Sequence, residues 1–373
     1  KILILNWRET KHPKSGGAEI VTMNHAVSWV RSGHSVTWLT SGHSRVPTHE
    51  TYQGVNIVRK WGSLTVYLYV PWYLWLRGRH FDVIVDEVHG IPFFSPLFTG
   101  TPVVVFIHEI AGEIWNFMYP FPVNVLGRAL ESLYFRLYKH CRFWTDAPST
   151  IRELVKRGIP QDQCTAIPCP ITLEKAVVSQ NQKKDAIPTY VFVSRVVRMK
   201  GIEEVVKAFS FIVKEQHGAR LWIVGGGDDG YIHQLRAMMS EYGVLPNVTF
   251  WGKVPEDKKM ELMAKAHILL HASVKEGWGL VVLEAAYAGT PSVVYNVAGL
   301  CDVVKNGKTG VVLTDNLPHE MAREAVRLYL DKKRYGEYQK NGKIWAASLK
   351  WPDVTATSLS LLKKVAKEKR SAL

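Results

Sequence analysis

Cysteine is scarce in this chain, and long apolar runs are absent from it. Its four cysteines form no Cys-x-x-Cys pair and no Cys/His pair with zinc spacing, which excludes a disulfide scaffold and a zinc finger. The longest apolar run, 67–76, contains Pro71 and falls short of the ~18 residues that span a bilayer. No secretory signal pattern opens the sequence. We therefore expect a cytoplasmic protein with reduced thiols at Cys141, Cys164, Cys169 and Cys301.

Acidic residues are the minority among the charged ones. The chain has 33 Asp and Glu against 47 Lys and Arg, a net charge of +14. A charge of this sign indicates an anionic partner, and nucleic acid, anionic lipid and phosphorylated substrates all satisfy it. The length of 373 residues allows two domains of ordinary size.

Short β-branched runs alternate with helical patterns along most of the chain, which is typical of parallel β-α-β units in an α/β fold. A polar stretch punctuated by proline interrupts the series. We therefore expect two Rossmann-like domains, 1–172 and 186–349, joined by a linker at 173–185. Such sheets bind ligands at the carboxyl ends of their strands, and two of them facing each other would form a cleft. The expected strands are 2–6, 35–40, 56–59, 83–86, 103–108, 143–146, 190–194, 220–225, 248–251, 268–271, 292–295 and 311–313.

Two motifs of the first domain follow expected strands. The sequence SGGAE at 15–19 opens an expected helix, where Gly17 lets the backbone approach a ligand and the helix start favours an anion. A plain tight turn is the alternative. His108, followed by Glu109, ends a central strand and can hydrogen-bond a hydroxyl group or take part in proton transfer. A single histidine is, however, more often structural.

Basic residues follow the first strand of the second domain. Arg195 and Lys200 can both contact one diphosphate, because Arg offers a planar fork of donors and Lys a point charge. A solvated basic turn is the alternative, and Arg198 is the weaker candidate because it can face solvent. The GGGDDG run at 225–230 fits G-x-G-x-x-G, but two aspartates occupy the place of a pyrophosphate, which argues against dinucleotide binding. We keep Gly225 as part of a glycine turn at the ligand site.

Two carboxylates bracket a Gly-x-Gly turn in the segment EGWGLVVLE at 276–284. The turn lies between an expected strand and an expected helix, so the backbone N–H groups near Gly279 form an anion site. Glu276 lies just before this site, and Glu284 lies one to two turns into the helix. A phosphate loop with a carboxylate on each side suits a nucleotide diphosphate-sugar. The alternative is a capped core helix with two solvated glutamates.

The chain contains no Asp-x-Asp sequence, which is the commonest carboxylate arrangement for a metal-bound sugar nucleotide. We therefore expect neither a metal nor a cofactor. The charge of a diphosphate would instead be offset by Arg195, Lys200 and the helix start near Gly279.

Five motifs occur in the order seen in the retaining glycosyltransferases of family 4, which the sequence resembles over nearly its whole length. They are GGAE at 16–19, HE at 108–109, Arg195 with Lys200, GGG at 225–227, and Glu276 with Glu284. The resemblance implies a GT-B fold, with an N-terminal acceptor domain and a C-terminal domain for the nucleotide-sugar donor. The segment LKWPDV at 349–354 is also similar to the family, and it implies that 350–373 forms a helix crossing back to the N-terminal domain.

The resemblance also implies roles for single residues. Arg195 and Lys200 would bind the diphosphate and stabilise it as the leaving group, with Gly17 beneath it. His108 and Glu276 would contact the donor sugar at the reacting centre. The turn at Gly225 would line the donor site, and Glu284 would hold the ribose of the nucleotide. The backbone of Gly279, Leu280 and Val281 would contact the phosphate and the sugar. The backbone near Lys253 and Val254 would contact the base. The sequence DAPS at 146–149 is less typical of the family and leaves the acceptor side open.

Aromatic and basic residues occur together in two segments, 61–81 and 114–143. Such stretches suit a membrane interface, but they suit domain packing equally well, and a helical leucine stripe is more often core. We expect a lipid-linked saccharide or growing polysaccharide as the acceptor, with the protein free in the cytoplasm or at the inner face of the plasma membrane. The stripe in the second segment consists of Leu126, Leu130, Leu133 and Leu137.

The function implied by the resemblance is transfer of a hexose from a nucleotide diphosphate sugar to a saccharide or lipid-linked saccharide, in the synthesis of cell-surface polysaccharide or exopolysaccharide. UDP-glucose is the first choice of donor. Two alternatives stay open: an epimerase that acts on a UDP-sugar with the same fold, and a non-catalytic binder of nucleotide sugar or nucleic acid. No nucleic-acid-binding module occurs in the sequence, which argues against nucleic acid.

Overall fold

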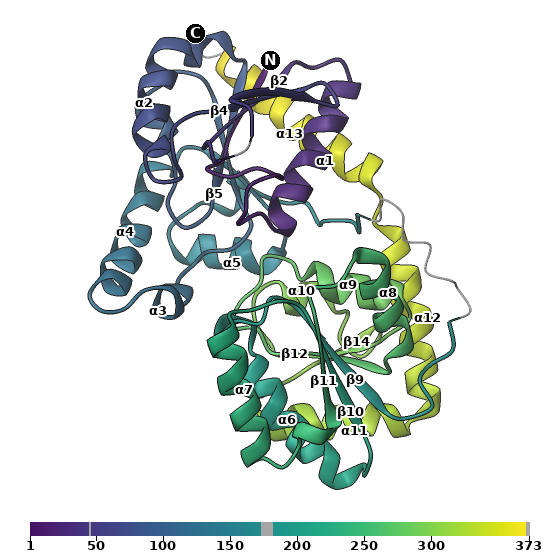
Figure 1. The fold of residues 1–373 in the computed structure, drawn as a ribbon. Coiled ribbons are helices and arrows are strands. Elements are labelled where there is room, and N and C mark those ends of the chain that lie inside the picture. Colours follow the sequence, from purple (N-terminus) through teal and green to yellow (C-terminus); the bar gives the residue numbers. More distant parts are fainter. Residues whose placement is uncertain (45, 173–181, 371–373) are drawn as a thin grey trace. The chain divides into compact units, whose positions relative to one another are not determined.

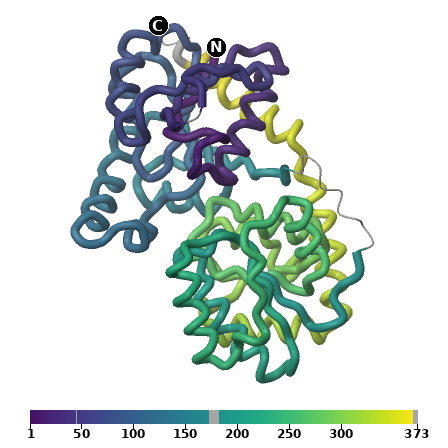
Figure 2. Tube along the Cα trace, in the orientation of Figure 1, coloured from purple at the N-terminus to yellow at the C-terminus, as the bar shows by residue number. Residues whose placement is uncertain are grey.

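Two units of α/β structure make up the chain (Figure 1; Figure 2). The computed structural model describes residues 1–44, 46–172 and 182–370. Of the linker expected at 173–185, residues 173–181 lie outside the described residues. Unit 1 comprises Lys1–Thr172 with Lys350–Leu373, and unit 2 comprises Leu173–Leu349.

The described part of unit 1 is built on an eight-stranded sheet. Its strands are β1 (Ile2–Leu5), β2 (Val36–Thr40), β3 (His49–Tyr52), β4 (Val55–Arg59), β5 (Val83–Val88), β6 (Val103–Ile107), β7 (Arg142–Thr145) and β8 (Cys164–Ala166). The order across the sheet is β3-β4-β2-β1-β5-β6-β7-β8, and only β3 and β4 pair in antiparallel fashion among the described strands. The helices of unit 1 are α1 (Gly17–Arg31), α2 (Val66–Arg77), α3 (Ile114–Met118), α4 (Val123–Leu137), α5 (Pro148–Lys156) and α13 (Trp351–Arg370), with 3₁₀ turns η1 (Gly78–His80), η2 (Ser95–Leu97) and η3 (Gln161–Gln163).

Helices cover both faces of this sheet, because its parallel strands are apolar on both faces. Leu3 and Leu5 of β1 share one core cluster with the inner residues of α2, α4 and α5. Side chains of a strand alternate between faces, so Ile2 and Ile4 point to the other side, where α1 and α13 pack against each other. The sheet is therefore the middle layer of three.

The last helix, α13, packs on the N-terminal unit, as the resemblance implied. His25 Nδ1 and Trp29 Nε1 of α1 both lie within hydrogen-bond distance of Ser358 Oγ, at 2.9 and 3.1 Å. Ser28 Oγ donates to Thr355 Oγ1 at 2.8 Å. These buried polar groups satisfy one another, so they fix α13 to α1 at a defined register.

The described part of unit 2 is built on a six-stranded sheet in which all neighbours are parallel. Its strands are β9 (Thr189–Val193), β10 (Arg220–Val224), β11 (Val248–Gly252), β12 (Ile268–His271), β13 (Ser292–Val294) and β14 (Gly310–Val312). Their order is β11-β10-β9-β12-β13-β14. The helices are α6 (Ile202–Glu215), α7 (Asp229–Glu241), α8 (Glu256–Lys265), α9 (Leu280–Tyr287), α10 (Leu300–Val303), α11 (Pro318–Leu330) and α12 (Lys332–Ser348), with 3₁₀ turns η4 (Arg198–Lys200) and η5 (Leu245–Asn247).

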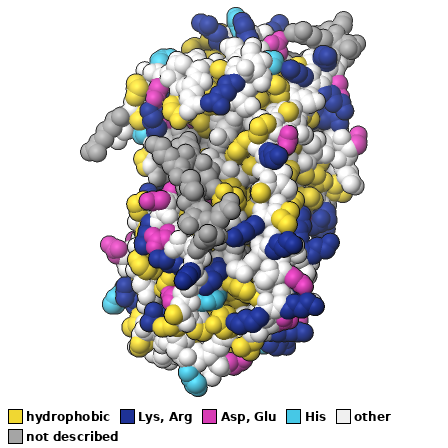
Figure 3. Space-filling model, turned by 90° about the vertical axis from the view of Figure 1, so that its right-hand side faces the viewer, with side chains coloured by type: hydrophobic (Ala, Val, Ile, Leu, Met, Phe, Trp, Pro, Cys, Tyr) yellow, Lys and Arg dark blue, Asp and Glu magenta, His cyan; other side chains and the backbone are white. Residues whose placement is uncertain are grey.

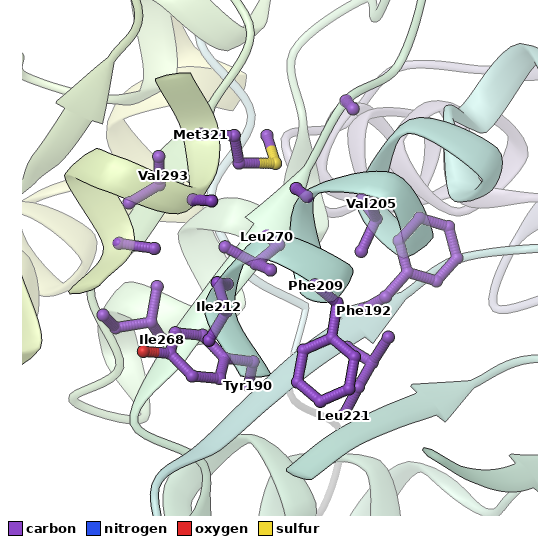
Figure 4. Packing of buried hydrophobic residues seen from close by; sticks show 14 of the residues in the cluster. Tyr190, Phe192, Val205, Phe209, Ile212, Leu221, Ile268, Leu270, Val293 and Met321 are labelled. Atoms are coloured by element: carbon purple, nitrogen blue, oxygen red, sulfur yellow. The ribbon is translucent and has the colours of Figure 1, made fainter. Parts of the chain in front are cut away.

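The core of unit 2 lies between its sheet and helices α6 and α11 (Figure 4). In α6, Val205, Phe209 and Ile212 recur at helical spacing and are fully buried. They pack in one cluster with Phe192 of β9 and Leu270 of β12. This packing fixes the strands, and the strands fix the loops at their carboxyl ends.

The expected strands are found at their positions, with ends shifted by at most two residues. Strands β3 and β8, which lie at the two edges of the unit 1 sheet, were not predicted from the sequence. Strand β3 is polar and largely exposed, so it lacks the apolar run that marked the others. It pairs with β4 through a two-residue turn, in which Gln53 and Gly54 both have positive φ values (47° and 85°), as a type I′ hairpin requires.

Lysine and arginine side chains are spread over the face drawn in Figure 3, with hydrophobic side chains between them. The excess positive charge of the sequence is therefore not gathered into one stripe on this face. Among the described helices, none combines the length and the apolar content needed to cross a bilayer.

Candidate active site

Charged side chains gather at the carboxyl edge of the unit 1 sheet. Glu87 lies near the end of β5, His108 directly follows β6, and Asp146 directly follows β7. Because these three strands are adjacent and parallel, their ends lie side by side. Of the three residues, the sequence analysis selected only His108.

His108 is held between two carboxylates. Its Nδ1 lies 2.5 Å from Asp146 Oδ2, and its Nε2 lies 3.0 Å from Glu87 Oε1. Burial disfavours the charged ring, but the neighbouring Asp146 and Glu87 carboxylates outweigh burial and raise the pKa of His108 to about 10. Both ring nitrogens donate to a carboxylate in this state. The geometry therefore favours a fixed positive charge at His108 over a general base.

The cluster extends from His108 to the glycine turn at the start of α1. His89 Nε2 lies 3.0 Å from Glu87 Oε1, and Arg8 Nη2 lies 3.3 Å from His89 Nδ1. Arg8 Nε bonds Glu19 Oε1 at 2.5 Å, and Glu19 Oε2 accepts the backbone N–H of Gly16 at 2.6 Å. The turn that contains Gly17 is thus tied to the same network as His108.

Glu87, His89 and His108 are close enough to bind a metal ion, with ligand atoms within 4.8 Å of one another. In this structure Arg8, which can only donate, faces Nδ1 of His89. Nε2 of His89 lies 3.0 Å from the Glu87 carboxylate and 3.3 Å from the Asn6 amide Nδ2. Both imidazole rings thus lie with Nε2 against one carboxylate oxygen, Glu87 Oε1.

Unit 2 places its predicted residues at the corresponding edge of its own sheet. Lys200 ends the η4 turn after β9, and Glu276 follows β12. Lys200 Nζ lies 2.6 Å from Glu276 Oε1, and Ser273 Oγ donates to the same oxygen at 2.7 Å. His271 Nε2 lies 3.0 Å from it. The three side-chain donors found among the described residues all reach Oε1, and none of them reaches Oε2.

Glu276 is ionised in this setting. Burial opposes the charge, but the Lys200 ammonium and the hydrogen bond from His271 outweigh it and hold the pKa of Glu276 well below its ordinary value. His271 is fully buried, and its Nδ1 has no partner among the described residues. Among the described residues, the Lys200 ammonium is the cation that neutralises the Glu276 carboxylate.

The turn after Glu276 leads into α9 through a glycine. Gly279 precedes the first residue of the helix with φ of 92°, a left-handed conformation that favours glycine. The first N–H groups of α9, at Leu280 and Val281, are not used inside the helix. The predicted anion site is thus an open helix start a few residues from Glu276.

Glu284 has a partner that the sequence analysis missed. Its Oε2 lies 2.7 Å from Lys259 Nζ of α8, and Lys259 also pairs with Glu256 at 2.6 Å. Burial raises the pKa of Glu284, although the Lys259 ammonium opposes this. A lysine at this helical position looks like an ordinary surface residue, so only the contact between α8 and α9 reveals it.

The remaining predicted residues differ in their surroundings. Arg195 and Arg198 are both exposed, and Arg198 pairs with Glu203 at 3.4 Å and lies over the Tyr231 ring. Gly225 serves close packing: a Cβ there, at φ of 141°, would lie 1.8 Å from the Ser194 carbonyl oxygen. Val254 is half-buried after β11, and Asp228 of the GGGDDG run caps α7 by accepting from the Tyr231 N–H.

Two family models match consecutive parts of the chain, from residue 15 to residue 345. The model described as Glycosyltransferase Family 4 matches residues 15–175, and the model described as Glycosyl transferases group 1 matches residues 175–345. The chain is also 29% identical over 269 residues to the GDP-mannose-dependent alpha-(1-6)-phosphatidylinositol monomannoside mannosyltransferase of Mycobacterium tuberculosis. That match covers 69% of this chain and 67% of the relative.

Solved structures share the fold. The chain superposes on the Anabaena protein HepE in complex with UDP and glucose with a TM-score of 0.74 at 15% identity, over 97% of this chain and 99% of HepE. It superposes on the sucrose-phosphate synthase of Thermosynechococcus elongatus with a TM-score of 0.79 at 18% identity, over 98% of both chains. Identities this low establish architecture only. Together, the two matching models and the shared architecture show that the chain is a glycosyltransferase of family 4 with the GT-B fold.

Proposed function

We propose that this glycosyltransferase transfers a hexose from a nucleotide diphosphate sugar with retention of the anomeric configuration. One observation carries the proposal: the Lys200 ammonium, the Glu276 carboxylate and the open start of α9 lie together at the carboxyl edge of the unit 2 sheet. A cation and free N–H groups suit a diphosphate, and an ionised carboxylate beside them suits the hydroxyl groups of a sugar.

The departing diphosphate is the group that most needs electrostatic stabilisation, because it gains negative charge as the bond to the sugar breaks. Lys200 and Arg195 would supply positive charge, and the backbone N–H groups from Gly279 to Val281 would donate hydrogen bonds. In other enzymes, one such donor contributes about a hundredfold to a thousandfold in rate. Glu276 would hold the donor sugar.

The remaining roles follow the resemblance. Glu284 would hold the ribose, and the backbone near Val254 would contact the base. In the first unit, His108 would contact the donor sugar, and Gly17 would approach the diphosphate. The turn at Gly225 would shape the donor site rather than donate to it, because its backbone is packed against Ser194.

Two donors have support. UDP-glucose is the first choice from the resemblance, and HepE has been crystallised with UDP and glucose. GDP-mannose is the competing donor, because the mycobacterial relative is named as dependent on it. Both carry a hexose on a nucleoside diphosphate, so the proposed chemistry is the same and only the base and sugar contacts differ.

The proposed acceptor is a saccharide or a lipid-linked saccharide used in surface polysaccharide or exopolysaccharide synthesis, at the inner face of the plasma membrane. The name of the mycobacterial relative states a lipid-linked acceptor, a phosphatidylinositol monomannoside. The lipid-linked acceptor of this relative supports the proposed acceptor by analogy within the family.

We also propose that transfer needs no metal. The positive charge at the unit 2 edge comes from Lys200, Arg195 and α9, which together can offset a diphosphate. In unit 1, the hydrogen bond from the charged His108 ring to Glu87 supports the same proposal for the group of Glu87, His89 and His108.

The test is transfer itself. Purified protein is incubated with UDP-glucose or GDP-mannose and a membrane extract that contains lipid-linked saccharides, and release of the nucleoside diphosphate is followed with and without EDTA. Proton NMR of the product reports the anomeric configuration. We expect release that depends on the extract, survives EDTA and yields an α-linkage from an α-linked donor.

Three results would contradict the proposal. A β-linked product would exclude retention, and activity lost with EDTA and restored by Mg²⁺ would exclude metal independence. A change in the identity of the donor sugar without any acceptor would instead favour the epimerase.

A further inference from the structure

Helices α2 and α4 lie on the same face of the unit 1 sheet and point apolar side chains away from it. Their inner residues, Val70 and Leu74 of α2 and Tyr134 and Phe135 of α4, belong to one core cluster. Figure 1 shows both helices along one side of unit 1. The outer surfaces of the two helices therefore belong to one side of the unit, and we call this surface the α2–α4 face.

The outer side of α2 is apolar without interruption. Trp75 is 75% exposed and Leu68 is 71% exposed, with Trp72 exposed between them. No charged residue occurs from 61 to 76. The aromatic residues of this segment divide by type: Tyr67 packs in the core, stacked on Phe93 at 4.6 Å, while the tryptophans face outward. Core packing thus explains the tyrosines and leaves the tryptophans unexplained.

The outer side of α4 carries the leucine stripe. Leu126 is 65% exposed and Leu133 is 54% exposed, and Leu130 and Leu137 are exposed as well. The core interpretation of the stripe, which the sequence allowed, is wrong: the buried side of α4 is the one that carries Glu131, Tyr134 and Phe135. Exposed leucines at helical spacing form a continuous apolar surface that soluble proteins rarely leave open without function.

Positive charge borders the α2–α4 face, and exposed negative charge is missing from its two segments. Arg77 ends α2, Arg79 lies in the following η1 turn, and Arg128 and Arg136 lie exposed along α4. The segment 61–81 contains no acid. The only acid in 114–143 is Glu131, which is buried and accepts the N–H groups of Ala111 and Gly112 at 2.8 and 2.7 Å. The face therefore combines exposed leucine and tryptophan with basic side chains and no exposed acid from its two segments.

We infer that the α2–α4 face docks on the interface of an anionic lipid bilayer. Tryptophan is favoured at the boundary between acyl chains and headgroups, and arginine attracts anionic headgroups. A second copy of the chain fits less well, because two identical faces brought together would oppose their own arginines. The inference deepens the proposed function and rests on it for the acceptor: docking would bring a lipid-linked saccharide within reach of unit 1.

The experiment measures co-sedimentation of the full chain with vesicles of phosphatidylglycerol and phosphatidylcholine in equal parts, and with vesicles of phosphatidylcholine alone. The face variant is Leu68→Ser with Trp75→Ser, which leaves the core residues of α2 in place. The matched control is Leu330→Ser with Ile344→Ser, which removes two exposed apolar side chains from unit 2. A charge variant, Arg128→Gln with Arg136→Gln, tests the arginines. Thermal shift with the donor nucleotides and the oligomeric mass are recorded for each protein.

We expect the wild type and the control to bind anionic vesicles at low salt and to bind less as salt rises. The affinity of the face variant for vesicles should be lower by about tenfold or more, because the variant has less apolar side-chain area to transfer from water into the bilayer. The charge variant should lose about thirtyfold in affinity for anionic vesicles, at about fivefold for each arginine, and little for neutral ones. All variants should keep the donor-induced thermal shift of the wild type.

Three outcomes overturn the inference: no vesicle binding by the wild type, equal binding by the face variant, or a dimer that only the face variant loses. The donor measurement separates these failures from failure of the proposed function. A donor shift without vesicle binding removes the membrane inference alone. Vesicle binding that depends on the face, without any donor shift, supports docking and removes the proposed donor chemistry alone.

Discussion

The buried position of His108 between Asp146 and Glu87 makes the stability of unit 1 depend on pH. With a folded-state pKa of about 10 against an ordinary value of 6.5, the folded protein keeps a proton that the unfolded chain releases. The stabilisation is fully present below the unfolded value and is lost as the pH rises through the folded value. At roughly 1.4 kcal/mol for each pKa unit, the contribution reaches about 5 kcal/mol, and about half of it is lost between about pH 7 and about pH 9.

The perturbation is His108→Gln, which keeps a polar side chain but cannot carry the proton. Unfolding of the two units need not be concerted, so the assay must report on unit 1 alone. Hydrogen exchange of the β6 amides, corrected for the intrinsic pH dependence, gives the opening free energy next to His108. The control is His217→Gln, an exposed histidine of unit 2.

We expect the wild type and the control to lose about 2 to 3 kcal/mol of opening free energy at β6 over this pH range, and His108→Gln to lose little. An equal loss in wild type and His108→Gln would refute the assignment of a buried imidazolium. The reasoning would then have to return to a neutral ring that can accept a proton.

Three further predictions concern the second unit. Glu276→Gln should lower turnover by about a hundredfold or more, because the carboxylate acts on the donor sugar. The donor nucleotide should still raise the melting temperature of this variant, because the diphosphate is bound by other groups. Undiminished turnover would refute the role of Glu276. Lys259→Met should weaken nucleotide binding several-fold, because Glu284 would stay buried without its cation. Calorimetric titration would show this as a higher Kd. An unchanged Kd would mean that the function of Glu284 does not depend on the ion pair with Lys259. Gly225→Ala should destabilise unit 2 by more than about 1 kcal/mol in urea unfolding, and by more than Gly243→Ala, a control with positive φ but open space around its Cβ; equal losses would mean that the contact with Ser194 relaxes freely.

The strands and their order along the chain could be predicted because each buried parallel strand leaves an apolar run in the sequence. The position of a site residue could be predicted by the same rule, because polar residues that follow such runs lie at the carboxyl edge. Glu87 and Asp146 obey that rule as well as His108 does. They were passed over because carboxylates near strand ends are common, and only their contact with one imidazole distinguishes them.

The direction of an amphipathic helix could not be predicted from its pattern. The leucine stripe of α4 has the spacing of a core face, yet the helix buries Tyr134 and Phe135 and exposes the leucines. Periodicity shows that a helix has two faces, and larger aromatic side chains on the second face decided which one packs on the sheet. Contacts between elements, such as that of Lys259 with Glu284, could not be predicted from the sequence either, because the pattern of a helix does not show which neighbour it packs against.

The central claim, a nucleotide-sugar donor bound at the carboxyl edge of unit 2, is tested most directly by thermal shift. The melting temperature is measured with UDP, GDP, ADP and their sugars on the wild type and on Glu284→Ala, since a ligand that binds only the folded state raises it. The account predicts a selective rise with one nucleotide and its sugar that is lost in Glu284→Ala. No rise with any nucleotide, or an equal rise in the variant, would contradict it.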